Sequence, residues 1–311
     1  MTAAVLALVA AVPCLYWTQG IDSRPTLESA GIKRLCVPPD QVEAWRKAGF
    51  NVTATSDADF SAREALPVPG TTPRPGVASP TRAPWIVASG WRFMRAPTGK
   101  YSYTVPAGKA ALALAEGAAY GGDVVLKIEA ADVPAAGAML TFLDSLPTLD
   151  LPPAADFGVV DDGSAITAEA MNLLARRNLL FEIEKAPAAR YRINVAIGTA
   201  AYPAQDAADP SAFAQKIRAQ LTDEQRSLRI YGSEVVIARL TSDGKRARVH
   251  LINYGGREIE GLRVRVRGTY QGGDAYLAGT GKAALQDQVV ADGAIEFSLP
   301  KFGAYAVVDL R

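Results

Sequence analysis

Histidine and cysteine are scarce in this chain, and their scarcity excludes several common kinds of active site. Among 311 residues there are one histidine and two cysteines. His250 stands alone in a predicted strand of the C-terminal region, where we expect a structural role, so a Ser-His-Asp or Cys-His relay lacks its base. Zinc hydrolysis lacks its usual ligands, and no GxGxxG or Walker-type loop indicates a nucleotide. We therefore expect neither a metal nor a cofactor.

An excess of charge of one sign is also absent. The 33 lysines and arginines nearly balance the 32 aspartates and glutamates, for a formal net charge of +1, and the basic residues are scattered along the chain. No basic stripe is interleaved with aromatic residues. Nucleic acid is therefore not an expected partner.

Long apolar runs are missing too, so no integral membrane segment is predicted. The apolar run at 2–12 is typical of a signal-peptide core, and we interpret residues 1–11 as a signal-peptide remnant. This interpretation predicts a secreted or periplasmic protein. The alternative is a buried first strand in a cytoplasmic protein. Cys14 and Cys36 flank two consecutive predicted strands, so they either pair in an exported protein or remain two buried thiols.

The stretch from 155 to 187 has the clearest local pattern of the chain. Two short apolar runs, at 157–160 and 179–184, enclose a segment of about twelve residues with helical periodicity. Strand, helix and strand form a βαβ unit, which requires parallel pairing.

The second strand of this unit has one apolar face and one charged face, because side chains alternate along a strand. Phe181 and Ile183 share one side, and Glu182 and Glu184 share the other. The predicted strand at 123–129 repeats the pattern. A strand between two helical layers would be apolar on both faces. A closed barrel, with helices outside and a polar mouth, explains the pattern and predicts a (β/α)8-type fold.

The pattern of predicted strands and helices changes near residue 228. Before it, eight predicted strands are mostly separated by helices; after it, short alternating strands such as LRVRVRG follow one another without a helix. We assign 12–225 to the barrel and 226–311 to a small all-β antiparallel sandwich. The barrel segment is shorter than the about 250 residues typical of the fold, so we expect some helices to be missing.

This layout resembles that of many secreted glycoside hydrolases, and VHLINYGGREIEGLRVRVRG looks like the sandwich that closes such enzymes. The resemblance implies a carbohydrate or glycoside substrate. In the large group of barrel glycosidases the nucleophile is a glutamate near the end of the seventh strand, where Glu182 and Glu184 lie. The same group carries its acid/base glutamate at the end of the fourth strand. Here that strand ends at 88–91 without a carboxylate.

Glycoside hydrolysis requires two carboxyl groups, one to protonate the leaving oxygen and one to attack or to activate water. We predict Glu184 as nucleophile or base, Glu129 as acid, and Glu182 as a further catalytic candidate. The residues expected to bind substrate lie at predicted strand ends: Asp22, Trp91, Arg92, Lys127, Asp161, Asp162 and Asn194.

Alternative interpretations of these residues remain open. Glu182 and Glu184 can form a purely structural ion network with Lys127 and Arg192. Likewise, Asp162 or Ser164 can serve only as the cap of the predicted helix that follows. For the whole chain, the alternatives are a catalytically inactive carbohydrate-binding or assembly module of the same architecture, and an aldolase or lyase that uses Lys127 as a Schiff base.

Overall fold

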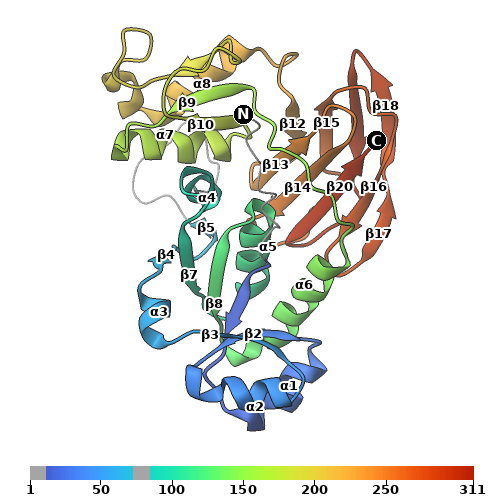
Figure 1. The fold of residues 1–311 in the computed structure, drawn as a ribbon. Helices are drawn as coiled ribbons and strands as arrows, with labels where there is room; N and C mark the ends of the chain where they lie inside the picture. Colours follow the sequence, from blue (N-terminus) through green and yellow to red (C-terminus); the bar gives the residue numbers. More distant parts are fainter. Residues whose placement is uncertain (1–11, 73–84) are drawn as a thin grey trace, which may run out of the picture. The chain divides into compact units, whose positions relative to one another are not determined.

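The computed structural model describes residues 12–72 and 85–311 (Figure 1). The chain divides into two compact units. The first unit contains the described residues up to Gly70 together with Ala96–Asp150. The second contains those of Thr71–Arg95 together with Leu151–Arg311.

The first unit is built on a six-stranded sheet in which every pairing is parallel. Its strands, in spatial order, are β3 (Asn51–Ala54), β2 (Arg34–Val37), β1 (Cys14–Tyr16), β8 (Asp123–Lys127), β7 (Lys100–Thr104) and β4 (Glu64–Ala65). β1 pairs with β2 on one side and with β8, more than a hundred residues away in the sequence, on the other. Parallel neighbours require such long crossovers.

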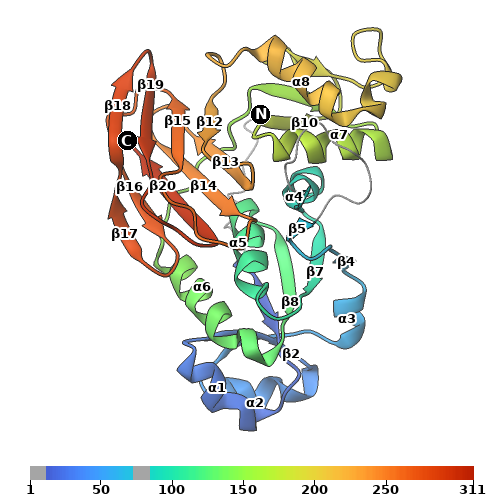
Figure 2. The same cartoon turned by 180° about the vertical axis from the view of Figure 1, so that it is seen from behind.

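Helices connect and cover these strands. They are α1 (Arg24–Ser29), α2 (Val42–Lys47), α3 (Asp57–Ser61), α5 (Ala110–Tyr120) and α6 (Val133–Ser145), with the 3-10 turns η1 (Ile21–Ser23), η2 (Pro39–Gln41) and η3 (Ala130–Asp132). α5 packs against β8 and α6, and α6 packs against α1 (Figure 2). A left-handed residue, Gly121, ends α5, as is common at helix C-termini.

Cys14 and Cys36 form a disulfide, which confirms the paired alternative. The two residues lie on the adjacent strands β1 and β2, with Cα atoms 5.8 Å apart. The register explains the bond, because Cys36 lies opposite Tyr16, and Cys14 is two residues before Tyr16 on the same face.

The second unit begins with a three-stranded parallel sheet, in the order β10-β9-β11. Its elements are α4 (Gly90–Arg95), β9 (Phe157–Val160), α7 (Ala165–Arg176), β10 (Phe181–Glu184), β11 (Asn194–Val195), η4 (Ala204–Ala208) and α8 (Pro210–Leu221). β9, α7 and β10 form the predicted βαβ unit, and Ser164 caps α7 by accepting the Thr167 amide. A separate two-stranded sheet consists of β5 (Gly70–Thr72) and β6 (Trp85–Val87).

The described residues do not show the expected closed barrel. Among the described residues, the parallel strands belong to two separate open sheets, one of six strands and one of three. The alternation of apolar and charged residues that suggested a barrel has another cause in β10. One face of its sheet packs on helices and the other carries polar side chains. An open sheet covered on one side produces the same pattern of period two.

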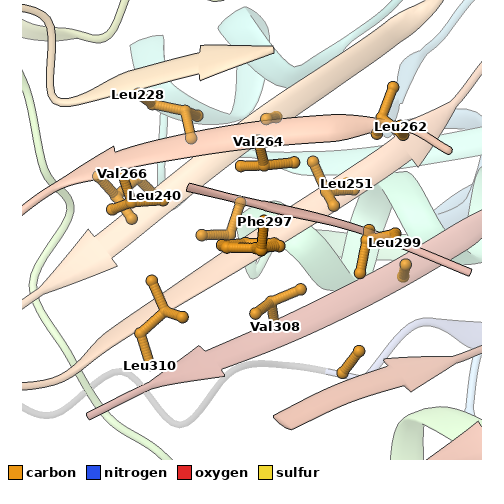
Figure 3. Close-up of a cluster of buried hydrophobic side chains, with 14 of the residues drawn as sticks. Leu228, Leu240, Leu251, Leu262, Val264, Val266, Phe297, Leu299, Val308 and Leu310 are labelled. Atoms are coloured by element: carbon orange, nitrogen blue, oxygen red, sulfur yellow. The ribbon is translucent and has the colours of Figure 1, made fainter. Parts of the chain in front are cut away.

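The rest of the second unit consists of two antiparallel sheets that share one hydrophobic core. The four-stranded sheet has the order β12 (Leu228–Tyr231), β15 (Arg263–Arg267), β19 (Ala294–Ser298) and β18 (Gln286–Ala291). The five-stranded sheet has the order β13 (Val236–Ser242), β14 (Ala247–Asn253), β20 (Tyr305–Leu310), β16 (Gly273–Leu277) and β17 (Gly281–Ala284). Figure 3 shows side chains of both sheets in this core, among them Val264 and Phe297 from one and Leu251 and Val308 from the other.

Among the helices of the described part, none combines the length and the apolar character needed to cross a bilayer.

Candidate functional site

The candidate site lies on the polar face of the β10-β9-β11 sheet. In the register, Glu182 and Asn194 both pair with Gly158, so the three residues form one row across the sheet. Glu184 lies two residues further along β10, on the same face and opposite Val160. The residues of opposite parity, such as Phe157 and Phe181, point into the helix-covered core. The fold therefore gathers the polar residues of three strands on one surface.

Arg190 and Tyr191 bind the two glutamates. The Nη2 atom of Arg190 is 3.1 Å from Oε2 of Glu182 and also forms an ion pair with Oε1 of Glu184. The Tyr191 hydroxyl donates a hydrogen bond to Oε2 of Glu182 at 2.5 Å. The side chain of Glu184 is 16% exposed, whereas that of Glu182 is 45% exposed. Glu184 is thus the more enclosed carboxylate, and Glu182 and Arg190 remain open to solvent.

Asn194 holds the loop that carries Arg190 and Tyr191. Its Oδ1 accepts the Ala188 amide at 2.8 Å, and its Nδ2 donates to the carbonyl oxygens of Ala188 and Tyr191 at 3.1 and 3.0 Å. All polar atoms of this amide therefore bond to the loop, which makes Asn194 a positioning residue of the cluster.

Gly158 makes this arrangement possible. A Cβ atom built there would lie 3.0 Å from Oδ1 of Asn194 and from Cδ2 of Tyr191, and 3.3 Å from Cγ of Glu184. These contacts are tighter than ordinary carbon contacts. Because glycine has no side chain, the side chains of Glu184, Tyr191 and Asn194 can occupy the space beside it.

The electrostatics of the cluster follow from these contacts. Burial is the main cause that raises the pKa of Tyr191, so its phenol stays protonated and acts as a donor. The pKa of Arg190 is raised by hydrogen bonds, first with Tyr191 and then with Glu182, so this guanidinium is charged throughout the accessible pH range.

Asp161 and Asp162 follow β9 and have local partners. Asp161 accepts a bidentate pair from Arg95, with Nε and Nη2 at 2.8 and 2.7 Å from its two oxygens. The Arg95 hydrogen bonds are the largest cause that lowers the pKa of Asp161. Asp162 accepts the Ser164 amide at 2.9 Å, and the residue that caps α7 is Ser164, not Asp162. These contacts order the loop that leads from β9 into α7.

Trp91 lies in the core between α4 and the parallel sheet and is 7% exposed. The guanidinium carbon of Arg92 is 4.4 Å from its ring centroid. This geometry makes Trp91 an anchor of α4 in the packing of the unit.

Three predicted site residues belong to the first unit, whereas the cluster belongs to the second. Asp22 is exposed in η1, Lys127 is exposed at the end of β8, and Glu129 is exposed just before η3. Lys127 and Glu129 stand at the carboxyl end of a parallel strand, the edge where α/β sheets bind ligands. The pairing of Glu129 with Glu184 stays a prediction.

Arg190 and Tyr191 were not predicted from the sequence. The structural ion network considered for Glu182 and Glu184 named Lys127 and Arg192 as partners. In the structure the cation is Arg190, while Nη2 of Arg192 donates to the carbonyl of Gln220 at 2.9 Å. The sequence signal that could have identified them is the shortness of the segment at 185–191 between two predicted strands. A short connection places its last residues beside the strand that precedes it.

An open pocket of about 460 Å³ adjoins the cluster at Asn194 and is also lined by Arg192, Ile193, Tyr202 and Gln220. Its lining combines an aromatic ring with hydrogen-bonding groups. Within the described ranges, no three His, Cys, Asp or Glu side chains converge as a metal site would require.

His250 is enclosed in β14, where its Nδ1 lies 2.6 Å from the Tyr305 hydroxyl. Burial is the main cause that lowers its pKa. The imidazole is thus neutral and part of the packing of the five-stranded sheet.

No model of a known protein family matches the chain, and no curated protein matches its sequence. Among solved structures, α-L-fucosidase isoenzyme 2 from Paenibacillus thiaminolyticus matches with a TM-score of 0.56 at 8% identity, over 88% of this chain and 70% of that chain. The GH42 β-galactosidase Gan42B from G. stearothermophilus matches with a TM-score of 0.40 at 8% identity, over 88% and 67%. A rhamnosidase from Novosphingobium sp. PP1Y matches with a TM-score of 0.27 at 13% identity, over 84% and 20%. The first match shows a fold similar to that of a glycoside hydrolase.

Proposed function

We propose that this chain is a glycoside-hydrolase-like protein that acts on carbohydrate through carboxylates, with Glu184 as its nucleophile or base. The observation that carries the proposal is the polar cluster on β10, in which an enclosed glutamate at the carboxyl end of a parallel strand is bound by Arg190. The similarity in fold to an α-L-fucosidase supports a glycoside as the substrate class.

The cluster can supply one of the two carboxyl groups that glycoside hydrolysis requires. A carboxylate that attacks a sugar, or activates water, must be charged and rigidly held. Glu184 is held by Arg190 as an ion pair, and the loop that carries Arg190 is fixed by Asn194. Tyr191 donates a hydrogen bond to Glu182, which keeps that carboxylate beside the same guanidinium. Glu182 is therefore proposed to assist Glu184.

The second carboxyl group is proposed to be Glu129, acting as the acid. A retaining mechanism needs its carboxyl group about 5–5.5 Å from that of Glu184, and an inverting mechanism about 6.5–9.5 Å. Lys127, at the end of β8, and Asp22, in η1 of the same unit, are proposed to contact substrate. Arg92, Trp91, Asp161, Asp162 and Asn194 are proposed to shape the site on the side of Glu184.

We further propose that the protein is exported. Disulfides form and persist in oxidising compartments and are rare in the cytosol. The bond between Cys14 and Cys36 supports the secreted or periplasmic alternative.

The test is a screen with aryl glycosides and oligosaccharides, starting with α-L-fucosides, β-D-galactosides and α-L-rhamnosides. On the substrate that is cleaved, Glu184→Gln and Glu129→Gln should each lower kcat/KM by about 100-fold or more. Glu258→Gln is the matched control, since Glu258 forms an exposed ion pair with Lys301 in the antiparallel region. Its activity should stay at the wild-type level.

Two outcomes contradict the proposal. If the glutamine variants retain full activity, the catalytic assignment fails. If the wild type cleaves nothing but binds sugars in calorimetry, the chain is the inactive carbohydrate-binding module.

A further inference from the structure

The outward face of the four-stranded antiparallel sheet carries a dense group of arginines. Along β15, Arg263, Arg265 and Arg267 alternate with Val264 and Val266, which lie in the shared core. The three arginines therefore share the opposite face.

The neighbouring strand β12 extends the group. In the antiparallel register, Arg229 lies opposite Arg265 and Tyr231 lies opposite Arg263, and directly opposed residues point to the same side. The guanidinium carbon of Arg229 is 5.0 Å from the ring centroid of Tyr231. We call Arg229, Tyr231, Arg263, Arg265 and Arg267 the arginine face.

Acidic residues neutralise only part of this face. Glu296, on β19, forms an ion pair with Arg263. Asp223 lies 3.6 Å from Arg229, but it is already bound by Arg218 at 2.8 Å and by Arg226 at 3.2 Å.

Arg265 and Arg267 have no ion pair with any described residue. Nη1 of Arg265 lacks a hydrogen-bond partner within the described ranges. Nη1 of Arg267 donates to the Gln225 carbonyl at 3.3 Å. Like charges opposite one another destabilise a sheet, and a buried donor without a partner adds to that cost. An anionic ligand on the outer face offsets the repulsion between these like charges.

We propose that the arginine face binds a polysaccharide whose sugar units carry carboxylate groups, that is, a polyuronate chain. Guanidinium groups bind carboxylates through two parallel hydrogen bonds. The face already holds one carboxylate, because Glu296 forms an ion pair with Arg263 although it lies opposite Arg265 in the register. A uronate carboxylate would make the corresponding contact with Arg265 or Arg267.

The dimensions of the face suit a linear chain with repeated charges. Side chains two residues apart on a strand are separated by about 6.5–7 Å, and those directly opposite by about 4.5–5.5 Å. Tyr231 supplies an aromatic ring for the apolar side of a sugar. A single-stranded nucleic acid would need several aromatic residues for base stacking, and the arginine face includes one. The preference for carboxylates rests on the face itself, whereas the choice of a polysaccharide rests on the proposed function.

The experiment measures binding of the full chain to polygalacturonate at low salt, by thermophoresis or affinity electrophoresis. Neutral galactan, dextran sulfate and an oligothymidylate are the comparison ligands. We expect polygalacturonate to bind best, with an affinity that falls as salt is added. The double variant Arg265→Gln/Arg267→Gln should weaken this binding by about tenfold or more, since each hydrogen-bonded charge contact contributes on that order.

The matched control is Arg24→Gln/Arg46→Gln, which makes the same change in charge at exposed arginines of the first unit. Its binding should stay within about twofold of wild type, because neither residue belongs to the arginine face. The proposal is overturned if both double variants lose binding equally. It is also overturned if dextran sulfate, oligothymidylate or neutral galactan binds more tightly than polygalacturonate.

The two proposals fail separately. A wild-type chain that cleaves no glycoside, but binds polygalacturonate through Arg265 and Arg267, refutes the proposed function and leaves the arginine face in place. A chain that cleaves glycosides and does not bind polygalacturonate refutes the arginine face alone. The Arg265→Gln/Arg267→Gln variant should cleave aryl glycosides at the wild-type rate, because neither arginine belongs to the proposed catalytic site.

Discussion

Replacing Asn178 with alanine should lower the free energy of unfolding of the second unit by about 3–4 kcal/mol. Asn178 follows α7, is 8% exposed and has a φ of 53°. Its Nδ2 donates to the Val236 carbonyl at 2.9 Å, and its Oδ1 accepts the Ala238 amide at 2.7 Å. β13, which contains both partners, is an edge strand of the five-stranded sheet. The Asn178 amide thus satisfies two backbone groups at the start of this edge, while Ala154 and Pro152 bond to Leu240 and Ser242 further along it.

The magnitude is the sum of two effects. Each buried hydrogen bond contributes about 1–1.5 kcal/mol net. An alanine in the left-handed region costs about 1 kcal/mol more than a residue that tolerates that conformation. Asn178→Gly separates the two effects, because glycine loses the same hydrogen bonds without the backbone cost. Its expected loss is about 2–3 kcal/mol.

Urea unfolding of the wild type and the two variants, without reductant, measures the differences. Hydrogen exchange of peptides from 236–242 should show which part of the unit opens first, and we expect faster exchange there in both variants. The reasoning is refuted if Asn178→Ala lies within about 0.5 kcal/mol of wild type, the usual range for surface changes. A glycine variant that is less stable than the alanine variant would refute the backbone part.

Three further results are expected. Gly158→Ala should reduce any glycosidase activity more than it reduces the melting temperature, because the new methyl group displaces the polar cluster; equal activity would contradict the cluster's role. Replacing Cys14 and Cys36 with serine should lower the stability of the first unit by about 3 kcal/mol, and reductant should destabilise the wild type but not this variant in thermal unfolding. Asp161→Asn removes a carboxylate whose pKa Arg95 holds below the usual 3.8. The wild type should exceed the variant in free energy of unfolding by a constant amount above that pH, and by less as the pH falls below it. A difference in stability that does not change with pH down to 2 would contradict the ion pair.

Local patterns in the sequence were sufficient for much of the architecture. The βαβ unit, the cap at Ser164 and the antiparallel strands after residue 228 are all present in the structure. These features depend on side-chain periodicity and on hydrogen bonds between near neighbours, which a sequence displays directly. The two faces of β10 were predicted in the same way.

The candidate site could be predicted only in part. The strand pattern placed Glu182 and Glu184 together on one face, since that depends on alternation alone. Their cation is Arg190, and the sequence offered other basic residues at similar strand ends. Which one reaches the carboxylates depends on the path of the loop that Asn194 fixes. Hydrogen bonds between the Asn194 side chain and the loop set that path, and the spacing of residues along the chain does not reveal them.

By itself the sequence determined which segments are strands and helices and which face of each strand is polar, because these properties follow from neighbours within a few residues. Only the tertiary structure decided which strands pair. It placed β8 beside β1, closed the bond between Cys14 and Cys36, and divided the parallel strands into two open sheets instead of a ring. The physical reason is that strands with one apolar face and one charged face can form either an open sheet or a barrel. The choice between them depends on packing between segments that are distant in the chain.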